Sequence, residues 1–167
     1  MYDTDRDEKT MEKPTIRISV RNLVEFILRS GDLDSRRGNI DKEAMLKGGR
    51  LHRKIQKQMG KEYRAEVPLK METEYEDLII AVEGRADGIF TESGKAVIDE
   101  IKGIYGNVDL MKEPVKVHRA QAMCYACIYG KKENLQEIGI QMTYANLDTE
   151  VIRRFSETLS MDEVTSW

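Results

Sequence analysis

Hydrophobic residues along the chain follow a helical spacing at first, then a strand-like spacing, and then a helical one again. Apolar side chains recur every three or four positions over residues 20–27, and Gly31 is placed to end this run. The same spacing predicts a second helix from Asp41, its candidate cap, to about Met59, with Gly60 as its stop. The N-terminal part of the chain is therefore predicted to be helical.

The middle of the chain changes to the period of two that is typical of strands. Residues 63–69 alternate, and an apolar run at 78–82 is continued or followed by a segment at 87–90. Residues 92–95 have the composition of a turn, and another strand follows at 96–102. Short turns between neighbouring strands favour an antiparallel meander.

The C-terminal third returns to a helix and then to strands. Pro114 precedes a predicted helix over 117–129, with Gly130 at its end. Alternation predicts a fourth strand over 138–144, and a fifth over 150–155 that is paired with it through a turn. The helix is expected to cross over between two strands of one sheet.

These elements together predict an α/β fold, with a central mixed sheet of about four or five strands flanked by helices. The charged residues 1–14 are expected to form a disordered tail, and 15–167 a single domain. Ser19 and Ser160 are candidate N-caps, and Glu163 completes a capping box with Ser160. The short helix that this box opens suggests a domain cut from a longer protein.

Composition restricts the classes of function that the chain can serve. The 167 residues include 27 Lys and Arg and 30 Asp and Glu, so the net charge is -3 and binding of polyanions by bulk charge is excluded. Apolar runs are too short to span a bilayer, so no membrane partner is expected. The two cysteines, Cys124 and Cys127, are expected to be buried thiols in a reducing cytoplasm.

Candidate chemistry lies in the predicted hairpin of the sheet. Asp87 ends one strand, and Glu100 and Lys102 lie on the next strand with the spacing Glu-x-Lys. Side chains alternate along a strand, so Glu100 and Lys102 share a face and Asp99 points to the other. Converging carboxylates can hold Mg²⁺ or Mn²⁺, and a lysine beside them can act on a water or a phosphate.

The sequence at this point resembles the RecB-type branch of the PD-(D/E)XK nuclease superfamily. The resemblance rests on four motifs that occur in the family's order over about residues 44–130. They are Gly49-Arg50-Leu51-His52, Gly84-Arg85-Ala86-Asp87, Glu100-Ile101-Lys102 and Gln121-Ala122-Met123-Cys124-Tyr125. The implied fold is a restriction-endonuclease-like core. The implied activity is Mg²⁺- or Mn²⁺-dependent hydrolysis of DNA, expected to be that of an exonuclease in repair or recombination.

The resemblance also implies roles for individual residues. His52, Asp87 and Glu100 would bind the metal with the carbonyl of Ile101, and Lys102 would act with Asp87 and Glu100 in catalysis. The substrate-binding residues would be Gln121 and Tyr125, which share a helix face. Glu66, on a flanking strand, is considered as a further acid near the metals but is left out of the ligand set. Some relatives hold an iron–sulfur cluster with four cysteines, and this chain is expected to hold none.

Other interpretations of the same residues remain open. The chain could be a weakly active or non-catalytic DNA-binding module of a helicase or repair protein, fused to it or associated with it. His52 could be an ordinary core histidine, Asp87 a turn residue, and Gln121 and Tyr125 interior helix residues. The acids could also be surface charges of an unrelated α/β domain.

Overall fold

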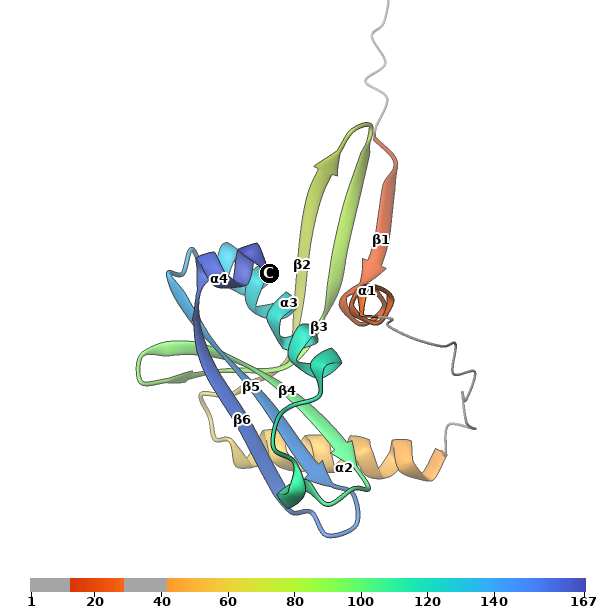
Figure 1. Ribbon diagram of the computed structural model, residues 1–167, viewed down its shortest axis with the longest axis vertical. Coiled ribbons are helices and arrows are strands. Elements are labelled where there is room, and N and C mark those ends of the chain that lie inside the picture. Colours follow the sequence, from red (N-terminus) through yellow and green to blue (C-terminus); the bar gives the residue numbers. More distant parts are fainter. Residues whose placement is uncertain (1–12, 29–41) are drawn as a thin grey trace, which may run out of the picture.

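The computed structural model describes residues 13–28 and 42–167 of the chain (Figure 1). The strands in these ranges are β1 (Thr15–Ser19), β2 (Arg64–Tyr75), β3 (Leu78–Glu92), β4 (Lys95–Ile104), β5 (Glu137–Asn146) and β6 (Ile152–Ser160). The helices are α1 (Val20–Ile27), α2 (Lys42–Gln58), α3 (Lys116–Lys132) and α4 (Met161–Ser166), with a 3₁₀ turn, η1, at Val108–Leu110.

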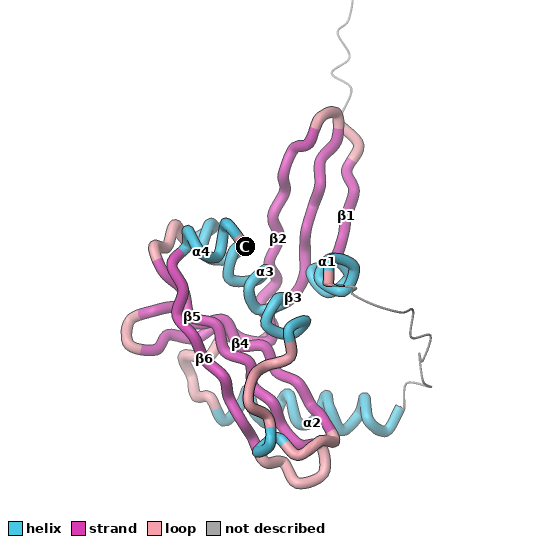
Figure 2. The backbone as a smooth tube through the Cα atoms, in the orientation of Figure 1, coloured by secondary structure: helices cyan, strands magenta, loops and turns pink. Residues whose placement is uncertain are grey.

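The six strands form one mixed sheet, in which the order is β1-β3-β4-β5-β6 and β2 pairs with β3. The β1–β3 and β4–β5 pairs are parallel, whereas β2–β3, β3–β4 and β5–β6 are antiparallel. Figure 2 shows short connections from β2 to β3, from β3 to β4 and from β5 to β6, whereas β4 leads to β5 through α3. The predicted α/β fold with a mixed sheet and flanking helices is confirmed, and so is the antiparallel meander. The sheet is larger than expected because β1 adds an edge strand.

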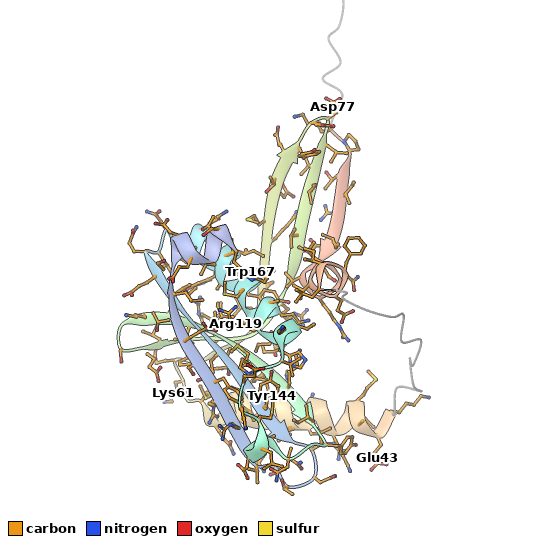
Figure 3. The ribbon with its side chains drawn as sticks, viewed as in Figure 1. Glu43, Lys61, Asp77, Arg119, Tyr144 and Trp167 are labelled. Carbon is orange, nitrogen blue, oxygen red and sulfur yellow. The ribbon has the colours of Figure 1, made fainter. Side chains whose placement is uncertain are left out.

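Strand β3 belongs to two parts of the molecule. Its first half pairs with β1 and β2, and these strands project as an arm that carries Asp77 at its tip (Figures 1 and 3). Its second half pairs with β4 only from Gly88 to Glu92. Along one edge of β3 the partner therefore changes from β1, which pairs up to Glu83, to β4, which pairs from Gly88, while β2 stays paired as far as Ile89.

Helices cover both faces of the sheet and bury two separate cores. The larger core lies under α3 and also takes in Val24 of α1 and Val164 of α4. The smaller core joins Leu51 and Ile55 of α2 to Ile101 of β4 and to Ala145. Consecutive residues of β4 point to opposite faces, so this strand serves both cores.

Several predicted boundaries differ from the structure. The first is that Lys13 and Pro14 belong to the folded part, since the Pro14 carbonyl accepts a hydrogen bond from the Ile79 amide. The second is that α3 continues through Gly130 to Lys132. A Cβ at Gly130 would lie 2.3 Å from the sulfur of Met161, so this glycine serves the close packing of α4.

The strands also run further than their alternation indicated. Segments 78–82 and 87–90 are parts of the single strand β3. Strand β2 continues past residue 69 to Tyr75, and β6 begins at Ile152 and reaches Ser160. These extensions carry exposed or half-buried side chains, because they lie in the arm or at the edge of the sheet.

The predicted caps that lie in the described residues are confirmed. The Ser19 hydroxyl accepts a hydrogen bond from the Asn22 amide, and Ser160 and Glu163 form the capping box. The candidate stop Gly31 and the candidate cap Asp41 lie outside the described residues. In the ranges that the structure describes, no helix has the length and apolar character needed to cross a membrane.

Candidate metal centre

The predicted site lies where β3 and β4 separate. The last pair of the ladder on this side is Gly88 with Asp99, and the next residues of the two strands, Asp87 and Glu100, are not paired. We call this place the fork and define it by Asp87, Glu100 and Ile101. The separation leaves backbone groups without ladder partners, which side chains must then satisfy.

Side chains from α2 and β3 supply those partners. The carboxylate of Asp87 accepts a hydrogen bond from the Ile101 amide at 2.7 Å. Gln56 donates to the Asp87 carbonyl at 2.9 Å, and His52, one turn earlier in α2, lies with Nε2 2.6 Å from the Ile101 carbonyl oxygen. A carbonyl oxygen only accepts, so Nε2 carries the imidazole proton in this arrangement. Asp87 is therefore a strand residue of the fork, and the interpretation as a turn residue is wrong.

Glu100 and Lys102 interact directly, as their spacing along a strand predicts. Lys102 Nζ lies 2.6 Å from Glu100 Oε1. The Glu100 side chain is only 5% exposed, whereas that of Lys102 is 30% exposed. The pair thus presents a buried acid at the fork and a cation that reaches solvent.

Asp99 points to the opposite face, where the chain itself satisfies it completely. Its carboxylate accepts hydrogen bonds from the hydroxyls of Tyr63 and Thr143 at 2.9 and 2.7 Å, and from the Gln141 amide at 3.2 Å. Asp99 is fully buried in this network. The predicted opposite direction of Asp99 is therefore confirmed, and the role of Glu100 as the site acid stays a prediction.

Helix α3 covers the fork from the other side. A Cβ on Gly84 of β3 would lie 2.6 Å from the hydroxyl of Tyr125 in α3. His118, also in α3, lies with Nδ1 3.0 Å from the hydroxyl of Tyr144 in β5. Gln121 shares the helix face of these two residues and lies between them, so it faces the stretch of sheet that contains Glu100. It is 5% exposed, and among the described residues its Oε1 has no hydrogen-bond partner. The structure therefore makes Gln121 and Tyr125 interior residues that border the site.

Burial of acids dominates the electrostatics of the fork. Desolvation raises the pKa of Asp87 to about 6, although the hydrogen bond from the Ile101 amide opposes the rise. Desolvation and the neighbouring Asp87 raise the pKa of Glu100 to about 7, with Lys102 acting in the opposite direction. Strong perturbation of two adjacent acids is typical of functional sites.

The groups on the α3 side are held neutral. Burial, with Lys102 as the next cause, lowers the pKa of His118 to about 4. Burial and the charge of Glu100 raise the pKa of Tyr125 to about 12. These two groups are thus uncharged at neutral pH, and the charges near the fork are those of the acids and Lys102.

The donor set at the fork suits a divalent cation. Ligand atoms of His52, Glu66 and Asp87 all lie within 4.8 Å of one another. Glu100 lies outside this tight group, although its charge interacts with those of Asp87 and His52. Carboxylates suit Mg²⁺ and Mn²⁺, and an imidazole among them makes Mn²⁺ at least as suitable as Mg²⁺. Glu66 is not in the ligand set that the sequence predicts, because no local pattern shows that β2 runs beside Asp87.

Two hollows reach the residues of the site. One, of about 610 Å³, is lined by His52, Lys102 and Tyr105 among others. The other, of about 700 Å³, is lined by Glu66 and Arg85 among others. Both are open to solvent, so an extended ligand has access to the fork.

Comparisons with known proteins support the fold and go no further. No protein-family model matches the chain, and no curated protein matches it. Among solved structures 24 chains match, including one titled "Crystal structure of SSO0001". That structure aligns with a TM-score of 0.59 and 18% identity, over 95% of this chain and 73% of the other. At this identity the likeness shows that the chain shares an α/β fold with that structure.

Proposed function

We propose that the protein is a metal-dependent DNA nuclease of the RecB-type branch of the PD-(D/E)XK superfamily. The observation that carries the proposal is the fork, where His52 Nε2 lies 3.8 Å from the carboxylate of Asp87, the charge of Asp87 acts on the buried Glu100, and Lys102 pairs with Glu100. Residues of all four motifs lie at the fork or border it. The order of the motifs in the sequence does not by itself require this proximity. We propose DNA repair or recombination in the cytoplasm as its setting, with a fused or associated helicase as its partner.

The chemistry follows from the groups at the fork. A bound Mg²⁺ or Mn²⁺ would activate a water and neutralise charge on the scissile phosphate. His52, Asp87, Glu100 and the Ile101 carbonyl would hold the ion, for which Nε2 of His52 must give up its proton. Lys102 keeps its ammonium at the solvent side of Glu100, where it can donate to a phosphate oxygen or orient the water.

The surroundings of the fork suit a long, thin substrate. The hollow at His52 and Lys102 and the hollow at Glu66 and Arg85 both reach the site. Each would offer space to a DNA strand bound at the fork. The net charge of -3 predicts weak DNA binding when no divalent cation is present.

A cleavage assay tests the proposal. Purified protein is incubated with single- and double-stranded DNA and with Mn²⁺, Mg²⁺ or EDTA, beside E100Q and K102A. We expect cutting that depends on metal and a loss of about 100-fold or more in each variant, as for removal of a group that stabilises the transition state. The exposed residues Glu92 and Lys112 offer the matched controls E92Q and K112A, which should cut like the parent.

Two results would contradict the proposal. If E100Q and K102A cut DNA as fast as the parent, the activity does not arise at the fork. Salt-sensitive DNA binding without any metal-dependent cutting would favour the alternative of a non-catalytic DNA-binding module.

A further inference from the structure

Glu66 occupies an unusual position in strand β2. The ladder on either side of it pairs Ala65 with Gly88 and Val67 with Ala86, which places Glu66 opposite Asp87. Its φ of 55° lies in the left-handed region, which costs a residue with a side chain about 1 to 2 kcal/mol. The strand thus departs from regular geometry at the residue that lies opposite Asp87.

Gln56 ties Glu66 to Asp87. The single amide group of Gln56 donates to Glu66 Oε1 and to the Asp87 carbonyl, both at 2.9 Å. Gln56 itself is 9% exposed, so it is a buried bridge between α2, β2 and β3. Its double donation holds the carboxylate of Glu66 close to His52, which lies one turn earlier in the same helix.

The spacing of these ligand atoms agrees with binding to one ion. Atoms of His52, Glu66 and Asp87 lie within 4.8 Å of one another. Two ligands on opposite sides of an ion with metal–oxygen distances of about 2.1 Å are about 4.2 Å apart. The 3.8 Å between His52 Nε2 and Asp87 Oδ2 is within the separation that two ligands of one ion can have. The half-exposed side chain of Glu66 leaves the ion a route from solvent.

Among the described residues, Gln121 of α3 has an unpaired buried acceptor, Oε1, on the side of the sheet to which Glu100 points. It faces the sheet between the contacts of His118 and Tyr125, where Glu100 lies. An unpaired buried acceptor costs about 1 to 3 kcal/mol, and a water carried by a cation would supply the missing donor.

The charge balance at the fork agrees with this. The charges of Glu66 and Asp87 act on one another, Asp87 also acts on the buried Glu100, and Lys102 pairs with Glu100. Arg85 approaches Glu66 at 3.6 Å but its side chain is 66% exposed, so water screens its charge. A divalent cation would offset the remaining negative charge.

We propose that Glu66 is a ligand of the divalent cation bound at the fork, together with His52 and Asp87. The inference rests on the proposed function, since it concerns the same cation. It adds a ligand from β2 that the family motifs do not contain. The cation would then join α2, β2 and β3 and stiffen the base of the arm.

Calorimetric titration with MnCl₂ in the absence of DNA tests the proposal. The parent is compared with E66Q, which keeps the acceptor for Gln56, and with E66D, which keeps the charge but shortens the side chain. We expect the Kd for Mn²⁺ to rise about 10-fold or more in both variants, because loss of even an outer partner costs that much. The exposed neighbour Glu62 provides the control E62Q, which should bind Mn²⁺ like the parent.

Each outcome has one interpretation, provided that circular dichroism shows the variants to be folded. A Kd for E66Q within two-fold of the parent would overturn the role of Glu66 and leave the proposed function intact. Weak binding by E66Q with normal binding by E66D would mean that only the charge matters, which also overturns ligation. A parent that binds no Mn²⁺ would overturn the proposed function itself.

Discussion

Replacing Glu100 by glutamine should stabilise the metal-free protein at high pH. Glutamine has nearly the shape of glutamic acid and stays neutral, so it imitates the protonated acid. In the native state burial and the neighbouring Asp87 raise the pKa of Glu100 from 4.5 to about 7. The native state therefore holds protons that the unfolded chain releases, and the free energy of unfolding falls as the pH rises from about 4 to 7.

The magnitude follows from the same values. A rise of the pKa from 4.5 to about 7 corresponds to a loss of about 3 kcal/mol once both states are ionised. The difference in unfolding free energy between E100Q and the parent should thus shift by about 2 to 3 kcal/mol in favour of E100Q between pH 4 and pH 8. Such a gain is typical when a functional group is removed from a site that is itself destabilising.

Urea unfolding in EDTA, followed by far-ultraviolet circular dichroism at several pH values, measures this difference. The control E92Q changes an exposed acid and should follow the pH dependence of the parent. Added Mn²⁺ should stabilise the parent more than E100Q, and more at pH 8 than at pH 5, because protons compete with the metal. A constant difference between E100Q and the parent over the whole pH range would refute the electrostatic reasoning.

Three further predictions concern packing beside the site, a buried hydrogen bond and the reactivity of a thiol. A Cβ at Gly88 would lie 1.9 Å from the Tyr63 ring, so G88A should displace the ring and destabilise the fold by about 1 to 3 kcal/mol, measured by urea unfolding; unchanged stability would contradict the contact. Y63F removes one donor from the fully buried carboxylate of Asp99 and should cost about 1.5 to 3 kcal/mol in the same measurement, whereas a neutral effect would mean that water replaces the hydroxyl. Cys124 and Cys127 are only partly buried, which corrects the prediction of buried thiols. Partial burial still raises the pKa of Cys124 to about 11, so its reaction with a thiol reagent at pH 8 should be much slower than that of a free thiol and should speed up on unfolding; equal rates in the folded and unfolded protein would contradict this protection.

The sequence predicts most of the fold because its patterns are local. Helical spacing locates α2 and α3, and alternation with turn residues locates β4 and β5, each to within a few residues. Strand β1 is missed because its five residues, with no buried side chain, carry almost no pattern. Its place is decided by pairing with β3, which lies about 60 positions later.

The site shows the same division between local and long-range information. The face shared by Glu100 and Lys102, and the opposite direction of Asp99, follow from alternation and agree with the observed contacts. The separation of β3 from β4 leaves no local signal, because it depends on where the partner along β3 changes from β1 to β4. The position of Glu66 opposite Asp87 depends on the register between β2 and β3, which no local pattern predicts.

The most direct test of a divalent-cation site at the fork is a crystal structure of the protein grown with Mn²⁺, with anomalous scattering recorded for manganese. The account predicts one strong anomalous peak within about 2.5 Å of ligand atoms of His52 and Asp87. A peak at the surface acids of the arm, with none at the fork, would contradict it.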